Sequence, residues 1–109
     1  MAYDAELADR IRRLAAGTPG LTEKPMFGGF AFLVGGNMAI AASGEGGVLV
    51  RVDPTGSDAL VAETPAEQAV MRGRAMSGWL RVADEHLDDA ELARWVDVGT
   101  EYAASLPPK

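Results

Sequence analysis

The sequence predicts an α+β domain of two layers, in which helices pack on a mostly antiparallel sheet. Two observations predict it. Apolar residues recur at helical spacing in residues 4–16 and 88–105, near the two ends of the chain. Between them, in residues 22–82, short runs of alternating residues are separated by glycine-rich turns, which is typical of antiparallel strands. The expected order is α-β(3)-α-β(2)-α.

The two terminal helices are predicted by their caps and stripes. Asp4 is a candidate N-cap for the first helix, and Gly17 is a natural residue just after its end. The last helix carries acidic residues in its first turn, where negative charge favours the helix dipole. Its apolar stripe includes Trp95 and Tyr102, so we expect both rings to pack toward the core.

Three strands are expected before the second helix: the first within residues 22–34, with its alternation at 30–34, and the next two at residues 38–43 and 48–52. Simple alternation places Met38 and Ile40 on the same face of the sheet. The pair Gly28-Gly29 interrupts the first strand, and glycine there is typical of a bulge or a close backbone approach. A short helix at residues 54–62 and two strands, at residues 70–71 and 78–82, complete the pattern.

Length and charge narrow the classes of function. A chain of 109 residues is expected to form a single domain, residues 1–109. We expect a cytoplasmic protein without a membrane span, because there is no signal-peptide pattern and no apolar run of about 20 residues. The net charge is −6, and most of the acidic excess lies in residues 84–109. Direct nucleic-acid binding is therefore not expected, since it depends on basic residues that neutralise phosphates.

Residues suited to catalysis are scarce. The chain has no cysteine and one histidine, His86, which we interpret as a solvated loop residue between acidic neighbours. No serine lies in a nucleophile-elbow motif, and neither a P-loop nor a G-x-G-x-x-G motif is present. The sequence therefore predicts no enzyme, no cofactor and no metal site.

Methionine and aromatic residues offer a candidate interaction surface, although core packing is the alternative for each of them. The segment at residues 74–79 places an arginine close to Trp79, where the arginine can stack on the ring or brace the sheet. We predict that the surface consists of six residues: Phe27, Phe30, Met38, Arg72, Arg74 and Trp79.

Several segments resemble the N-terminal domain of the TfoX/Sxy competence regulators. The most specific are Met-Phe-Gly-Gly at residues 26–29 and Gly-Arg-Ala-Met-Ser-Gly-Trp at residues 73–79. The resemblance covers essentially the whole chain, although Ala75 stands where proline is common and Ser77 where lysine is common. It implies an α+β fold like that of secretion chaperones. It also implies a relation to positive regulators of DNA-uptake genes, which add a helical C-terminal domain and work with a cyclic-AMP-receptor-type activator.

The leading hypothesis is a non-enzymatic regulatory domain, a homodimer that modulates transcription by binding a protein partner. An alternative is a binding domain or enzyme for an anionic small molecule, gripped by Arg51, Arg74 and Arg81. A further alternative is direct DNA binding, for which Arg51, Arg72, Arg74 and Arg81 are the available basic group.

Overall fold

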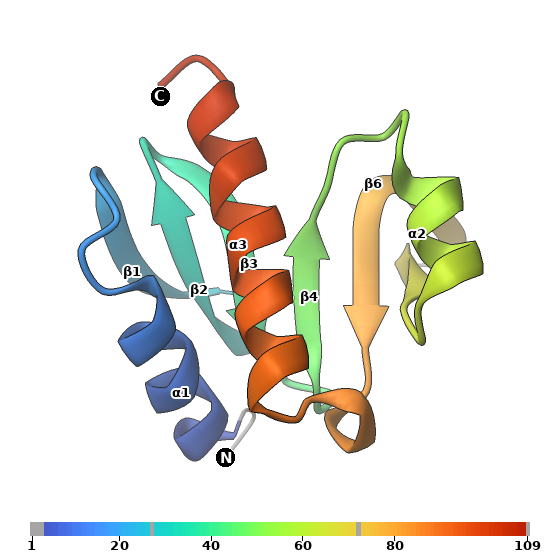
Figure 1. Ribbon diagram of the computed structural model, residues 1–109, viewed down its shortest axis with the longest axis horizontal. Coiled ribbons are helices and arrows are strands. Elements are labelled where there is room, and N and C mark those ends of the chain that lie inside the picture. The colour runs from blue at the N-terminus through green and yellow to red at the C-terminus, as the bar shows by residue number, and fades with distance from the viewer. Residues whose placement is uncertain (1–3, 27, 72, 109) are drawn as a thin grey trace.

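The computed structural model describes residues 4–26, 28–71 and 73–108, and it confirms the α+β fold class. Six strands form one antiparallel sheet in the order β1-β2-β3-β4-β6-β5. Figure 1 shows α1 and α3 side by side in front of this sheet, with α2 beside β6. The elements are α1 Ala5–Ala15, β1 Leu21–Met26, β2 Gly29–Val34, β3 Asn37–Ala42, β4 Val48–Arg51, α2 Ser57–Glu63, β5 Glu67–Met71, β6 Arg74–Val82, the 3₁₀ helix η1 Asp84–His86 and α3 Asp89–Ser105.

The structure has one strand more than expected before α2. Strand β1 pairs with β2 along its full length and forms one edge of the sheet. Alternation of apolar residues does not mark this strand, because it carries Glu23, Lys24 and Pro25. Charged residues and proline are common on edge strands, where they discourage pairing with another chain. Gly28, at φ +74°, belongs to the turn that separates β1 from β2, and Gly29 is the first residue of β2. A Cβ on Gly29 would lie 2.3 Å from the carbonyl oxygen of Ala42, which is the close backbone approach that the glycine pair predicts.

The main core lies between the helices and the front face of the sheet. Phe32 and Ile40 contribute from the central strands, while Leu7 and Trp95 contribute from α1 and α3. Leu60 and Val61 of α2 pack against the same cluster. The fully buried side chains of this core include Trp95, Phe32, Leu7, Ile11, Ile40, Leu80 and Leu92.

A bulge in β3 overturns the predicted facing of Met38 and Ile40. Phe32 pairs with Ile40, but the next residue of β2, Leu33, pairs with Met38, so Ala39 is an extra residue. An extra residue in one strand reverses the alternation beyond it. Ile40 therefore faces the helices, whereas Met38 belongs to a cluster on the opposite face.

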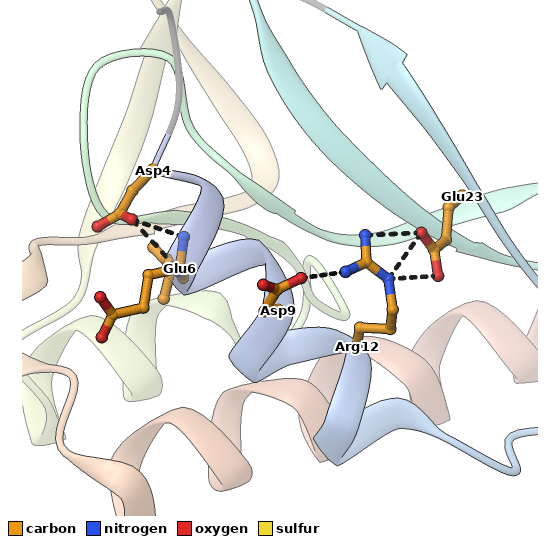
Figure 2. Close-up of polar contacts among 6 residues, drawn as sticks. Asp4, Glu6, Asp9, Arg12 and Glu23 are labelled. Carbon is orange, nitrogen blue, oxygen red and sulfur yellow. Dashed lines mark hydrogen bonds and ion pairs between the residues drawn. The ribbon is translucent and has the colours of Figure 1, made fainter.

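Helix α1 is fixed at its start and near its end by acidic side chains. Oδ1 of Asp4 accepts the backbone N–H of Glu6 at 2.9 Å, which confirms the predicted N-cap. Figure 2 shows this cap and the guanidinium of Arg12, which pairs with Asp9 and, at 3.0 Å, with Glu23 of β1. The hydrogen bond that Arg12 donates to the carboxylate of Glu23 raises the pKa of Arg12 above its ordinary value. This ion pair links α1 to the edge strand of the sheet.

Among the helices of the described part of the chain, none is both long and apolar enough to cross a membrane.

Candidate interaction site at the β6 bulge

Strand β6 departs from regular pairing in the middle of the resemblance motif. Gln68 of β5 pairs with Leu80, but Val70 pairs with Ala75, so residues 76–79 of β6 lie opposite Ala69 alone. The side-chain amide of Gln68 donates hydrogen bonds to the backbone carbonyl of Met76 and, at 3.3 Å, to that of Trp79. One side chain thus bridges the segment 76–79, called the β6 bulge below.

Gly78 is the residue that permits this backbone path. Its φ is +82°, in the left-handed region that favours glycine. A Cβ at this position would lie 3.0 Å from Cγ of Pro54 and 3.1 Å from the carbonyl oxygen of Val52. The carbonyl of Gly78 accepts the N–H of Val52 at 2.8 Å. The bulge is therefore held tightly against the end of β4, and Trp79 is placed next to it.

Behind the sheet lies a second apolar cluster, on the face opposite α1 and α3. Met76 and Trp79, both partly exposed, pack against it and cover it. No helix of the described residues belongs to this cluster. We call it the back cluster, and its buried members are Ala31, Leu33, Met38, Ala41, Leu49 and Ala69.

Arg51, the last residue of β4, lies between two aromatic rings. Its guanidinium carbon is 5.3 Å from the ring centroid of Trp79 and 5.9 Å from that of Tyr102 on α3. All three residues are partly exposed. Both distances fall within the range of cation–π attraction. This group, the Arg51 aromatic site, joins β4, β6 and α3 at one edge of the back cluster.

The structure separates the residues predicted from sequence as one surface. Met38 and Trp79 both belong to the back cluster, but Met38 is only 8% exposed and acts in packing. Phe30 packs against the core on the helix side, where its ring meets that of Phe32 at 5.6 Å. Arg74 is exposed at the start of β6. The remaining two residues, Phe27 and Arg72, lie outside the described residues.

The three arginines proposed as an anion grip have different surroundings. Arg81 pairs with the carboxylate of Glu45 and donates to the carbonyl of Gly46 at 3.0 Å, so it braces the turn before β4. Arg51 stacks on aromatic rings, and Arg74 is exposed beside the turn between β5 and β6. Their side chains thus serve three separate local structures.

Sequence reasoning missed two members of this site, Gln68 and Tyr102. Tyr102 lies on the apolar stripe of α3 and was therefore expected in the core. It instead remains partly exposed beside Arg51. No sequence pattern marks Gln68, because its role depends on the β6 bulge, which is seen only when the pairing of β5 with β6 is known.

Residues suited to acid–base or metal chemistry do not gather in the described part of the chain. His86 is exposed in η1. Within residues 4–26, 28–71 and 73–108, no three histidine, aspartate or glutamate side chains form a group that fits a metal ion. The carboxylate of Asp53 accepts hydrogen bonds from the backbone N–H of Thr55 at 2.9 Å and from its hydroxyl at 2.8 Å. These bonds lower the pKa of Asp53 below its ordinary value and explain an aspartate in this turn.

Comparison with known proteins identifies the family. A family model described as the TfoX N-terminal domain matches residues 13–103, which is most of the chain and includes every strand of the sheet and the whole β6 bulge. No curated protein matches the chain significantly, and neither does any solved structure. The match over most of its length shows that the chain belongs to the TfoX N-terminal domain family.

Proposed function

We propose that this protein is a non-catalytic regulatory domain that acts by binding a protein partner through the surface around the β6 bulge. Membership of the TfoX N-terminal domain family is the observation that carries the regulatory part, since it indicates a role in competence regulation. In this proposal the partner contacts Met76 and Trp79 together with Arg51 and Arg74. The outcome of binding is a change in transcription.

The geometry supports this location over the helix side of the molecule. On the helix side, three helices cover the sheet, and most of the large side chains of the core cluster are fully buried. On the other side, Met76 and Trp79 cover the back cluster while remaining partly exposed themselves. Tryptophan, methionine and arginine are enriched at protein interfaces, and tryptophan and arginine often carry most of the binding energy. Met76 and Trp79 of the bulge, with Arg51 and Arg74 on the adjoining strand segments, bring all three residue types to this surface.

Arg74→Glu tests the location of the partner surface. The tagged protein is purified from its native cells with nuclease, and its partners are quantified by mass spectrometry. Because Arg74 is exposed, the change reverses a surface charge without disturbing the core. The proposal predicts that a stoichiometric partner of the wild type is reduced at least about tenfold, since an interfacial charge reversal typically costs more than 1.4 kcal/mol.

The matched control is Arg13→Glu, an exposed arginine on α1. The control should retain the partner at the wild-type level. If both variants lose the partner equally, the loss is a general effect of charge. If both retain the partner at the wild-type level, the partner binds at another surface.

Homodimer formation belongs to the same proposal, with β5 as the contact. Val70 of this edge strand is 60% exposed, and β5 carries no proline. An edge strand that exposes an apolar side chain and contains no proline can pair with a second copy. The wild type should have the mass of a dimer in light scattering after size exclusion, and Val70→Lys should have that of a monomer. A monomeric wild type, or a dimer unaffected by this change, would contradict the β5 contact.

A further inference from the structure

We propose that the Arg51 aromatic site binds a carboxylate group. This site shares Arg51 and Trp79 with the surface of the proposed function, on which it rests, and it adds the chemical class of the group that these residues recognise. The ligand class is defined by chemistry: a planar anion with two oxygen atoms that face the edge of the Arg51 guanidinium. The carboxylate can come from a free organic acid or from an acidic side chain of another protein.

The first argument is that the charge of Arg51 lacks a counterion. Arg10, Arg12 and Arg81 each pair with a carboxylate. Arg51 has no such partner among the residues that the structure describes. The nearest carboxylate in sequence, Asp53, is occupied by two hydrogen bonds from Thr55. The neighbouring acid is thus directed into its own turn and away from Arg51.

The second argument is that the N–H donors of the guanidinium are unused. The ring centroids of Trp79 and Tyr102 lie 5.3 and 5.9 Å from its central carbon. An arginine carries five N–H donors, which lie in the plane of the group and point from its edges. None of them donates to an acceptor in the described residues. A carboxylate matches two parallel donors of such an edge, which makes the pair specific as well as strong.

The third argument is local solvent exclusion. Arg51 and the two rings are each partly buried, so part of the surface of the cation is shielded from water. A charge pair is stronger in such an environment than in open water. Arg94 provides a comparison within the same chain, because it also stacks on a tryptophan, Trp95, at 5.8 Å. Arg94 is exposed on the helix surface and has one ring, so we expect no such site there.

The test uses the indole N–H signals of the two tryptophans in nuclear magnetic resonance spectra. The full-length protein is titrated with sodium acetate against sodium chloride at equal ionic strength, and Trp95→Phe assigns the signals. The proposal predicts a saturable shift of the Trp79 signal with acetate at up to tens of millimolar, and no comparable shift for Trp95. Arg51→Gln should weaken binding at least about tenfold, the effect of losing one charge-assisted hydrogen bond. Arg94→Gln, which changes the net charge equally, should bind as the wild type does.

A second arm distinguishes the two sources of the carboxylate. A short capped peptide with one glutamate flanked by leucines is titrated in the same way. Tighter binding of this peptide than of acetate points to a protein side chain, while equal or weaker binding points to a free acid. The proposal is overturned if neither probe shifts Trp79 selectively, or if Arg51→Gln binds as the wild type does. If Arg51→Gln fails to fold, Arg51→Lys replaces it, because lysine keeps the charge but lacks the planar edge; unchanged affinity would then overturn the site.

Because this experiment requires no partner, it is independent of co-purification through Arg74. A positive titration with no co-purified partner would support the carboxylate site and contradict the protein-binding function. A co-purified partner that is lost in Arg74→Glu, together with no binding of either carboxylate probe, would support the protein-binding function and contradict the carboxylate site.

Discussion

At the scale of single residues, Gly99 decides how closely α3 approaches the sheet. A Cβ on this residue would lie 2.4 Å from the carbonyl oxygen of Ala39 and 3.4 Å from Val50. The absence of a side chain therefore lets the helix backbone rest on β3 and beside β4, as the arrangement in Figure 1 illustrates. Tyr102 is carried by the same helix one turn later, so the position of the Arg51 aromatic site depends on this contact.

Gly99→Ala is expected to destabilise the protein by about 1–3 kcal/mol, the usual cost of forcing extra atoms into a packed region. The sign of this change in the free energy of unfolding is informative, because a glycine-to-alanine change inside an exposed helix ordinarily stabilises a protein by about 1 kcal/mol. Urea unfolding followed by circular dichroism measures the difference. Gly56→Ala is the control: its φ is −104° and the nearest atom to a Cβ is 3.8 Å away, so it should change stability by less than about 0.5 kcal/mol. A stabilised Gly99→Ala variant would contradict the close contact.

At the scale of secondary structure, the β6 bulge is the feature that shapes the candidate site. The sequence predicted a strand containing Trp79 and a nearby turn, and both are present. It could not predict which residues share a face with Trp79, because two irregularities intervene: the extra residue Ala39 in β3 and the bulge in β6. Alternation relates residues within one regular strand only. Phe30 and Trp79 were grouped as aromatic candidates for one apolar surface, and the structure places them on opposite faces of the sheet.

Gly78→Ala tests how closely the β6 bulge packs against the end of β4. Gly73→Ala is its matched control in the same hairpin. Both glycines have positive φ, +82° and +75°, so alanine at either position carries a conformational cost of about 1–2 kcal/mol. A Cβ on Gly73 meets no atom within 4 Å, whereas one on Gly78 meets Pro54 and Val52. Gly78→Ala should therefore be the more destabilising by at least about 1 kcal/mol in urea unfolding. Equal effects would mean that the contact between the bulge and β4 is loose.

At the scale of the whole molecule, the fold class and the order of most elements were predictable from periodicity, caps and glycine turns. Strand β1 was not, because an edge strand with Glu23, Lys24 and Pro25 lacks the alternation that marks a buried face. The family was also predictable, and the match to the TfoX N-terminal domain model confirms that resemblance, whereas the partner and mechanism stay predictions. The Arg51 aromatic site joins β4, β6 and α3, and such contacts between distant segments leave no local pattern in a sequence.

The central claim is that a protein partner binds around the β6 bulge, and site-specific photocross-linking in native cells tests it most directly. A photoreactive phenylalanine analogue replaces Met76, which is partly exposed at the bulge, or Arg94, which is exposed on α3. The proposal predicts a discrete cross-linked product with another protein from position 76 and none from position 94. A product from position 94 alone, or none from either position, would contradict a partner surface at the bulge.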